Sequence, residues 1–333
     1  MDLIVEVGNT HEGSLGVAMS FVDMAKDAGA KCVKFQMHLA EFEGMQNEPF
    51  RKNFSSQDFS RQDYWKRVNF SFENWIKLAT YVQNKELEFL CTPFSVEAAN
   101  WLFENKLVKR WKVGSGDAVN FPLIDYLLTT NLPLIISTGL ISWPEIEELK
   151  LRLSSKGAWT RTMLMHCISM YPTPLEKSSL NIIEDLKKLG CKVGLSDHSG
   201  NWRVALRAIS IGIDALEVHL TPHRKYFGPD TPASLLPGEI KEILDVAHAW
   251  KVLDSNPGKK NEIFTEASDL RKIFRKGIYW KNDLDIGKII EFNDLIFRKP
   301  VEIFDSKDFE KILGRRLKKS VKSNLAVDQE DFD

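Results

Sequence analysis

The sequence predicts an α/β protein, a (β/α)8 barrel of the TIM type followed by a small, irregular, mostly-β domain. Two observations favour the barrel: short apolar runs alternate with amphipathic stretches, and eight such units spread over about 250 residues suit a closed barrel better than an open sheet. A third observation is the change of character after Ser268, where short alternating runs replace the longer amphipathic stretches.

The expected strands are rich in β-branched and apolar residues. They cover residues 3–7, 31–36, 88–92, 110–114, 133–137, 162–167, 192–196 and 213–219. Helical periodicity lies between them. It covers residues 17–28, 72–84, 96–105, 143–153, 183–189, 201–210 and 239–252. Gly29 and Gly190 stand where the first and fifth of these helices should stop.

The domain boundaries follow from composition. We expect the barrel over 1–254, a linker over 255–267 that contains Asn-Pro-Gly, and the small domain over 268–333. A domain of about 65 residues is marginal alone and gains from packing against another surface. The long connection at 37–70 predicts either a flap over the mouth of the barrel or a decorated loop.

The bulk composition is that of a soluble globular protein, with 43% hydrophobic and 27% charged residues and a net charge of −1. That balance gives no reason to expect nucleic acid or a membrane as partner. Met1 is followed directly by Asp2 and an apolar run, without a signal-peptide pattern. The four cysteines stand singly in apolar runs, which is typical of reduced core thiols in a cytoplasmic protein.

Polar residues stand at the carboxyl end of each predicted strand, where barrels of this type build their active sites. Each one alone could be a capping or turn residue, but a full ring of them indicates a functional site. The ring consists of Glu6, Lys34, Gln36, Thr92, Ser115, Asp117, Ser137, Thr138, His166, Ser196, His198, Glu217 and His219.

The ring contains groups that suit a phosphorylated anion. Lys34 and Lys112 can form charge-assisted hydrogen bonds to phosphate oxygens, and the strand-end hydroxyls can complete the cradle. The alternative interpretation of Lys112 is a surface lysine beside Arg110, but the following Val-Gly-Ser-Gly allows backbone to approach a ligand. The carboxylates Glu6, Asp117, Asp197 and Asp230 could hold a sugar, orient a water or fix a histidine tautomer.

His198 and His219 end two successive predicted strands. In a parallel barrel the two side chains should converge on the same mouth. Neutral imidazoles placed in this way are good ligands for a divalent metal with open positions. The alternative is that one or both are ordinary polar residues at strand ends.

The chain resembles the sialic acid (N-acetylneuraminate) synthase family nearly from end to end. The segments that carry the resemblance are Glu6-Val-Gly with His11-Glu-Gly, Val33-Lys-Phe-Gln, Cys91-Thr-Pro-Phe, Lys112-Val-Gly-Ser-Gly, Ser137-Thr-Gly, His166-Cys, Tyr171-Pro-Thr-Pro, Gly194-Leu-Ser-Asp-His, Glu217-Val-His and Gly228-Pro-Asp. The resemblance implies a transferase that condenses phosphoenolpyruvate with an open-chain N-acetylated amino sugar and releases phosphate by C–O cleavage. It also implies that the small domain over 268–333 is an antifreeze-like (SAF) domain, and that it caps the partner's active site in a domain-swapped homodimer.

The resemblance assigns roles to residues of this chain. It implies that phosphoenolpyruvate binds Lys34, Thr92, Lys112, Ser115, Ser137 and Ser196. His198 and His219 would hold Mn2+, with Mg2+ or Co2+ as alternatives. Glu6, Gln36, Ser169, Tyr171, Asp230, Arg298 and Lys299 would face the amino sugar. Asp117 is the predicted group for positioning the attacking water, with Glu6, His198 and His219 as the other catalytic residues.

The departures from the family pattern fall on the sugar side. Ser169 stands where members that act on N-acetylmannosamine often have Asn, Asp117 stands where Glu is common, and Arg298-Lys299-Pro replaces an Arg-Pro pair. N-acetylmannosamine is the favoured acceptor. The nearest alternative is a legionaminate or pseudaminate synthase that uses a diacetamido-trideoxyhexose. More distant alternatives are a keto-deoxy-sugar phosphate synthase and a non-catalytic sugar-binding protein.

Overall fold

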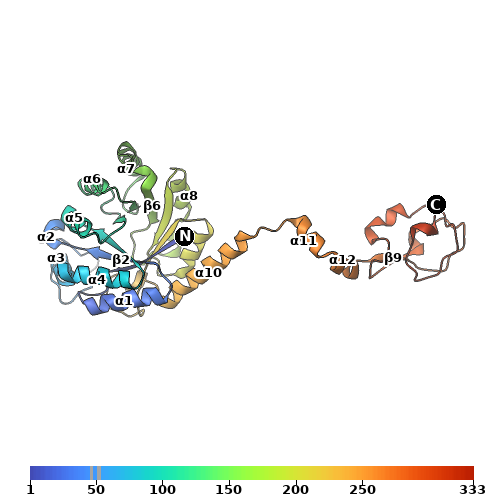
Figure 1. Ribbon diagram of the computed structural model, residues 1–333, viewed down its shortest axis with the longest axis horizontal. Coiled ribbons are helices and arrows are strands. Elements are labelled where there is room, and N and C mark those ends of the chain that lie inside the picture. Colours follow the sequence, from blue (N-terminus) through green and yellow to red (C-terminus); the bar gives the residue numbers. More distant parts are fainter. Residues whose placement is uncertain (46–47, 51–53) are drawn as a thin grey trace. The chain divides into compact units, whose positions relative to one another are not determined.

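The computed structural model describes residues 1–45, 48–50 and 54–333 and divides the chain into two compact units, Met1–Lys251 and Val252–Asp333 (Figure 1). Residues 46–47 and 51–53, which belong to the long connection predicted over 37–70, lie outside the described part. Each unit has its own apolar core.

The first unit is built on eight parallel strands in the order β3-β2-β1-β8-β7-β6-β5-β4. The strands at the two ends of this order, β3 and β4, also contact each other, so the sheet nearly closes into a barrel. The prediction of eight strands in a (β/α)8 fold is confirmed. The strands are β1 (Asp2–Gly8), β2 (Cys32–Met37), β3 (Glu88–Pro93), β4 (Trp111–Val113), β5 (Leu134–Ser137), β6 (Thr162–Cys167), β7 (Lys192–Asp197) and β8 (Ala215–His219).

Helices follow the strands and pack their apolar faces on the barrel (Figure 1). They are α1 (Leu15–Asp27), α4 (Phe72–Asn84), α5 (Val96–Glu104), α6 (Phe121–Thr129), α7 (Trp143–Ser155), α8 (Asn181–Lys187), α9 (Trp202–Ser210) and α10 (Pro237–Ser255). The side chains of Ser14, Ser71 and Ser95 accept hydrogen bonds from backbone amides in the first turns of α1, α4 and α5. Helix α6 was not among the predicted helices, because its run Leu-Ile-Asp-Tyr-Leu-Leu is too uniformly apolar to show a polar face.

The alternation of side chains along the strands stacks two layers inside the barrel. The lower layer is an apolar cluster that contains Ile4, Cys32, Leu90, Ile135, Met165 and Ala215. Residues two positions further along a strand point to the same side, one layer higher. That next layer consists of Glu6, Lys34, Thr92, Ser137, Cys167 and Glu217. The barrel therefore has a dry floor and a polar upper layer at the carboxyl ends of its strands.

The long connection between β2 and β3 carries two short helices, α2 (Ala40–Glu43) and α3 (Arg61–Val68). Tyr64, Trp65 and Val68 of α3 form a small cluster with Ala40, and Phe54 packs against it. The described part of this connection is thus a packed structure with its own apolar cluster.

The second unit contains α11 (Lys260–Glu266), α12 (Ser268–Phe274) and the antiparallel ribbon of β9 (Gly277–Trp280) and β10 (Leu295–Arg298). Trp280 lies in its core and donates a hydrogen bond to Asp331. The segment predicted as a linker contains α11, and helix α12 opens the segment predicted as mostly β. The rest of the unit is irregular and joined by isolated bridges, since short alternating runs lack the length for a regular sheet.

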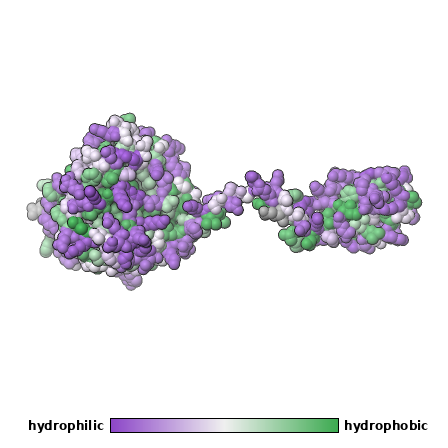
Figure 2. Space-filling view, in the orientation of Figure 1, coloured by the Kyte–Doolittle hydropathy of each residue, from purple (hydrophilic) through white to green (hydrophobic). Residues whose placement is uncertain are grey.

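Hydrophilic side chains dominate the visible faces of both units, with apolar patches between them (Figure 2). None of the helices in the described part of the chain combines the length and the apolar character that crossing a membrane requires.

Candidate active site

A cavity of about 490 Å³ opens at the carboxyl ends of the strands. It gathers most of the residues predicted from the sequence. They are Glu6, Lys34, Gln36, Thr92, Lys112, Ser115, Ser137, Ser169, Tyr171, Ser196, His198, His219 and Asp230. Its volume suits one or two small molecules rather than a macromolecular ligand.

Four of the predicted residues in the first unit, Asp117, Thr138, His166 and Asp197, do not line this cavity. Asp117 lies just beyond Ser115, and its carboxylate accepts a hydrogen bond from Asn120 at 3.0 Å in the turn that leads into α6. Burial raises the pKa of Asp117 above its ordinary value. Arg298 and Lys299 belong to the second unit, where Arg298 donates a hydrogen bond to Asn324.

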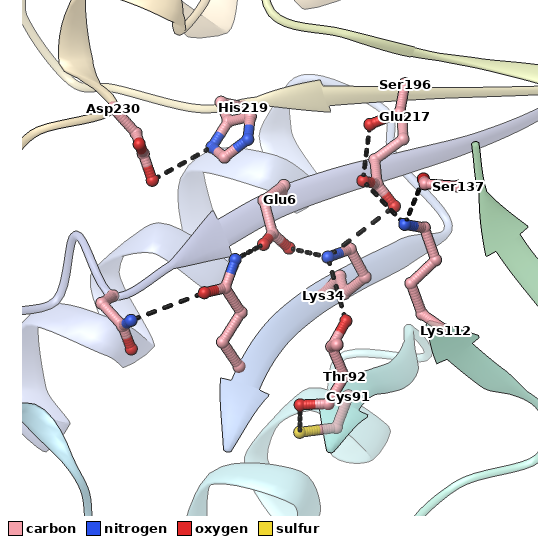
Figure 3. A network of polar contacts seen from close by, with 12 residues as sticks. Glu6, Lys34, Cys91, Thr92, Lys112, Ser137, Ser196, Glu217, His219 and Asp230 are labelled. Atoms are coloured by element: carbon pink, nitrogen blue, oxygen red, sulfur yellow. Dashed lines mark hydrogen bonds and ion pairs between the residues drawn. The ribbon is translucent and has the colours of Figure 1, made fainter. Parts of the chain in front are cut away.

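Two buried lysines face each other across the polar layer (Figure 3). Nζ of Lys34 lies 2.8 Å from the Glu6 carboxylate and 3.3 Å from Oγ1 of Thr92. Nζ of Lys112 donates to Oγ of Ser137 at 2.8 Å. Ammonium groups beside hydroxyls, at the bottom of a cavity, can bind an anion through charge-assisted hydrogen bonds.

Glu217 lies between the two lysines. Its carboxylate is 3.7 Å from Nζ of Lys34 and 3.5 Å from Nζ of Lys112, and it accepts a hydrogen bond from Ser196 at 3.0 Å. Burial acts to raise the pKa of Glu217, but the two ammonium groups outweigh burial and lower it to about 2. Burial also acts to lower the pKa of Lys34, which Glu217 and Glu6 raise; at Lys112 burial prevails and the pKa falls.

Glu217 is the main residue of this site that the sequence prediction left without a role. Its strand, Ala-Leu-Glu-Val-His, places it two residues before His219 and on the same side. The two-residue spacing was the signal that could have found it. Together with the carboxylate of Glu6, its carboxylate balances the charge of the two lysines.

Glu6 joins the lysines to the open part of the cavity. Its second oxygen accepts a hydrogen bond of 2.6 Å from the amide of Gln36, and the oxygen of that amide lies 3.5 Å from Nδ2 of Asn9. Gly8 follows Glu6 at a φ of 57° and interrupts the register between β1 and β2. A side chain at Gly8 would press on both the Glu6 carboxylate and the Gln36 amide, at 3.4 Å.

His198 and His219 lie in contact, with ring centroids 5.4 Å apart. Nδ1 of His198 lies 2.8 Å from the carbonyl oxygen of Ile168, so this nitrogen carries the proton and Nε2 is the acceptor, 3.0 Å from the Tyr171 hydroxyl. Burial, followed by His219, lowers the pKa of His198 to about 3 and keeps the ring neutral. Nδ1 of His219 is buried, 3.9 Å from the Asp230 carboxylate.

The burial and the hydrogen bonds of these two rings suit ligands of a divalent metal. Both are buried, and His198 is a neutral imidazole whose proton is fixed on the nitrogen away from the cavity. Nδ1 of His219 has no hydrogen-bond partner within the described residues. Over the same residues, no group of three or more His, Cys, Asp or Glu side chains is arranged to hold a metal.

Aromatic and apolar side chains form the outer wall of the cavity. They are Phe50, Phe54, Tyr64, Trp65, Phe94 and Leu140. Four of them come from the connection between β2 and β3, whose irregular sequence gave no prediction of individual contacts. The hydroxyls of Ser115 and Ser169, which also line the cavity, lie 3.3 Å apart.

The comparisons with known proteins agree on one family. The model of the NeuB family matches residues 21–257. The N,N'-diacetyllegionaminic acid synthase of Campylobacter jejuni is 29% identical over 331 residues, covering 98% of this chain and 98% of the relative. Human N-acetylneuraminate-9-phosphate synthase is 29% identical over 246 residues, covering 73% of this chain and 68% of the relative.

A solved structure agrees with these sequence matches. The N-acetylneuraminic acid synthetase of Leptospira borgpetersenii, crystallised with citrate, superposes with a TM-score of 0.69 at 28% identity. The likeness covers 81% of this chain and 92% of that chain.

Proposed function

The chain belongs to the NeuB family, and on that premise we propose that it is a transferase that condenses phosphoenolpyruvate with an open-chain N-acetylated amino sugar to give a nonulosonic (sialic) acid and phosphate. The observation that carries the proposal is the pairing, in one cavity, of the lysine–hydroxyl cradle with the two adjacent histidines.

The lysine–hydroxyl cradle would take phosphoenolpyruvate. Lys34 and Lys112 lie on opposite sides of Glu217, and Thr92, Ser115, Ser137 and Ser196 supply hydroxyls around them. An incoming phosphate or carboxylate would draw the ammonium groups from Glu217, exchanging one set of ion pairs for another. The buried setting strengthens these contacts because little water screens them.

The histidine pair would hold a divalent metal, Mn2+ in our proposal, with Mg2+ or Co2+ as alternatives. Such an ion, when bound, supplies Lewis-acid polarisation of the sugar's aldehyde oxygen. Ile168 fixes the tautomer of His198 through its carbonyl oxygen. The ring of Tyr171 stacks on His198 at 4.1 Å and keeps its orientation.

The reaction joins C3 of phosphoenolpyruvate to the aldehyde carbon of the sugar, and the aldehyde oxygen becomes a hydroxyl. Water adds at C2, a proton leaves, and the tetrahedral intermediate collapses to the keto acid by breaking the C–O bond to phosphate. Asp117, the carboxylate predicted to act on this water, lies outside the lining of the cavity, whereas the carboxylate of Glu6 lies in it. Glu6 is therefore the group that the geometry favours for the proton transfer.

The acceptor would occupy the open end of the cavity, between Gln36, Tyr171, Asp230 and the aromatic wall. N-acetylmannosamine is the acceptor favoured by Tyr171-Pro-Thr-Pro. A diacetamido-trideoxyhexose is the second candidate, and a specific observation favours it: the aromatic wall suits a sugar with methyl and acetamido groups in place of hydroxyls. The end-to-end match with the Campylobacter jejuni enzyme points in the same direction.

The second unit enters the proposal only through its resemblance to the antifreeze-like domain of the family. On that basis the protein would work in the cytoplasm as a domain-swapped homodimer, with Arg298 or Lys299 reaching the partner's sugar site. Lysine cannot reproduce a planar bidentate contact, so Arg298 is the better candidate.

Phosphate release tests the proposal directly. Purified protein with Mn2+ and phosphoenolpyruvate should release phosphate only when an acceptor from a panel of amino sugars is added. With 18O in the bridging position of phosphoenolpyruvate, the label should appear in phosphate, as C–O cleavage requires. Label retained in the keto acid would refute that cleavage, and sugar binding without phosphate release would favour a non-catalytic protein.

A further inference from the structure

A chain of hydrogen bonds runs from the β2–β3 connection into the lysine cradle. Oε1 of Glu43 lies 2.5 Å from Nδ1 of His38, and Nε2 of His38 lies 3.2 Å from Oε1 of Gln36. The Gln36 amide then donates to Glu6, which pairs with Lys34. Glu43 and His38 have no part in the function proposed above.

The directions of the hydrogen bonds in this chain depend on one another, and they can be followed from its Lys34 end. The Glu6 carboxylate contacts the Lys34 ammonium and can only accept, so Gln36 must turn its NH2 group toward it. The Gln36 oxygen then faces His38 and accepts a hydrogen bond from Nε2–H. A neutral His38 therefore leaves Nδ1 as an acceptor, and Glu43 must be the donor.

The surroundings of Glu43 favour its protonated form. Burial, with Asp117 and Glu48 nearby, raises the pKa of Glu43 to about 9. Its second oxygen, Oε2, is buried without a hydrogen-bond partner among the described residues, which costs much less for a carbonyl oxygen than for a carboxylate oxygen. Burial and the nearby Arg61 lower the pKa of His38 to about 3, so the pair is neutral.

The His38 ring is held between two aromatic rings. Trp65 stacks on it at 4.7 Å and Phe94 at 4.2 Å, with interplanar angles of 21° and 13°. The stack fixes the plane of the imidazole, and the Glu43 contact selects which nitrogen carries the proton. Trp65 and Glu43 both belong to the β2–β3 connection, so this segment sets the state of His38.

We propose that Glu43 and His38 are positioning residues that lock the Gln36 amide with its NH2 group toward Glu6. The inference rests on the proposed function, in which Gln36 faces the amino sugar. Without the Nε2 proton of His38, the Gln36 oxygen loses its main partner and the amide can flip. In the flipped amide, the Gln36 oxygen would face the Glu6 carboxylate, and Glu6 would lose the hydrogen bond from the Gln36 NH2 group.

Three variants separate this role from others. Glu43→Gln keeps a donor for Nδ1, Glu43→Leu removes it, and His38→Phe keeps the stack but removes both nitrogens. We expect Glu43→Leu and His38→Phe to raise KM for the amino sugar about tenfold, the loss that one buried hydrogen bond produces. The KM for phosphoenolpyruvate should stay within about twofold, because Lys34 and Lys112 keep their hydroxyl partners.

Glu43→Gln should restore KM for the sugar to within about twofold of the parent value. The double variant Glu43→Leu/His38→Phe should be no worse than His38→Phe alone, because both act through one amide. Glu41→Leu, at an exposed position of the same helix, is the matched control. The inference would be overturned if Glu43→Gln raised KM for the sugar as much as Glu43→Leu does. It would also be overturned if Glu43→Leu had the same KM as the control.

A measurement without substrates separates this inference from the proposed function. In 15N-histidine-labelled protein, His38, assigned by its absence in His38→Phe, should carry its proton on Nε2 with Nδ1 unprotonated. The side-chain amide signals of Gln36 should shift in Glu43→Leu and not in Glu43→Gln. A His38 ring with its proton on Nδ1 and none on Nε2 refutes the inference. Failure to release phosphate with every sugar refutes only the proposed function.

Discussion

The imidazole rings of His198 and His219 lie 5.4 Å apart because β7 and β8 are neighbours in register. Asp197 pairs with Val218. The next residue after each of them is a histidine, so His198 and His219 lie at the same height of the barrel. The sequence separates the two residues by a whole helix. The parallel topology, rather than any local motif, creates the pair.

The pair predicts a metal requirement that one substitution should expose. His198→Ala should lower kcat for phosphate release at least about a hundredfold while the protein stays folded, because under the proposed function this change removes one of the two histidine ligands of the metal. Chelator-treated parent protein should lose activity and regain it on addition of Mn2+. Initial rates of phosphate release and the circular dichroism spectrum provide the two readouts.

His248→Ala is the control for this experiment, since His248 is an exposed residue of α10. It should leave the rate and the Mn2+ dependence unchanged. Near-normal turnover of His198→Ala would show that the two histidines have no metal role.

The lysine cradle predicts a loss confined to one substrate. Lys112→Met should raise KM for phosphoenolpyruvate about a hundredfold, since a charge-assisted contact in a buried site is worth about 1.5–3 kcal/mol. The KM for the amino sugar should change far less. Steady-state kinetics with each substrate varied in turn measure both constants.

Lys109→Met removes a lysine from an exposed position just before β4 and should change neither constant. Equal rises in both constants for Lys112→Met would indicate a general collapse of the cavity rather than loss of an anion contact.

Much of this site was predictable because two periodicities determine it. The strand runs placed Lys34, Thr92, Ser137 and Ser196 at strand ends, and a barrel brings all strand ends together. Period-two alternation then makes the polar residues follow an apolar layer, as Glu6 follows Ile4. These are local patterns, readable from one sequence.

Glu43 and His38 could not be found in this way. Their contact depends on how the β2–β3 connection folds back over the barrel, and Trp65, which holds His38 in place, comes from a different helix. Asp117 lies outside the cavity lining for a related reason. It directly follows Ser115-Gly116, but its carboxylate accepts a hydrogen bond from Asn120 in the turn after β4. Positions in turns have no fixed side-chain direction, so strand periodicity does not extend to them.

Gly139 predicts a stability cost at the site. A methyl group there would lie 2.5 Å from Sγ of Cys167 and 2.8 Å from Oγ of Ser169. Gly139→Ala should lower the free energy of unfolding by about 1–3 kcal/mol, the usual cost of overpacking. Urea unfolding followed by tryptophan fluorescence measures the change.

Gly238→Ala is the control, because nothing lies within 4 Å of the added methyl group; this change should leave the free energy of unfolding unchanged or slightly higher. An unchanged midpoint for Gly139→Ala would mean that Cys167 and Ser169 move aside freely.

Ser169 should influence which amino sugar is accepted. Its hydroxyl lies beside that of Ser115 in the lining of the cavity. Ser169→Asn adds a carboxamide that can bind a sugar hydroxyl, and a site built for a hydroxyl discriminates against an analogue that lacks it. We expect the ratio of kcat/KM for N-acetylmannosamine to that for a diacetamido-trideoxyhexose to rise about tenfold, the value of one well-made hydrogen bond.

Ser179→Asn is the control, at an exposed position with a φ of 46° that Asn tolerates, and it should leave the ratio unchanged. A ratio unmoved by Ser169→Asn would place acceptor choice elsewhere in the cavity, with the aromatic wall as the next region to vary.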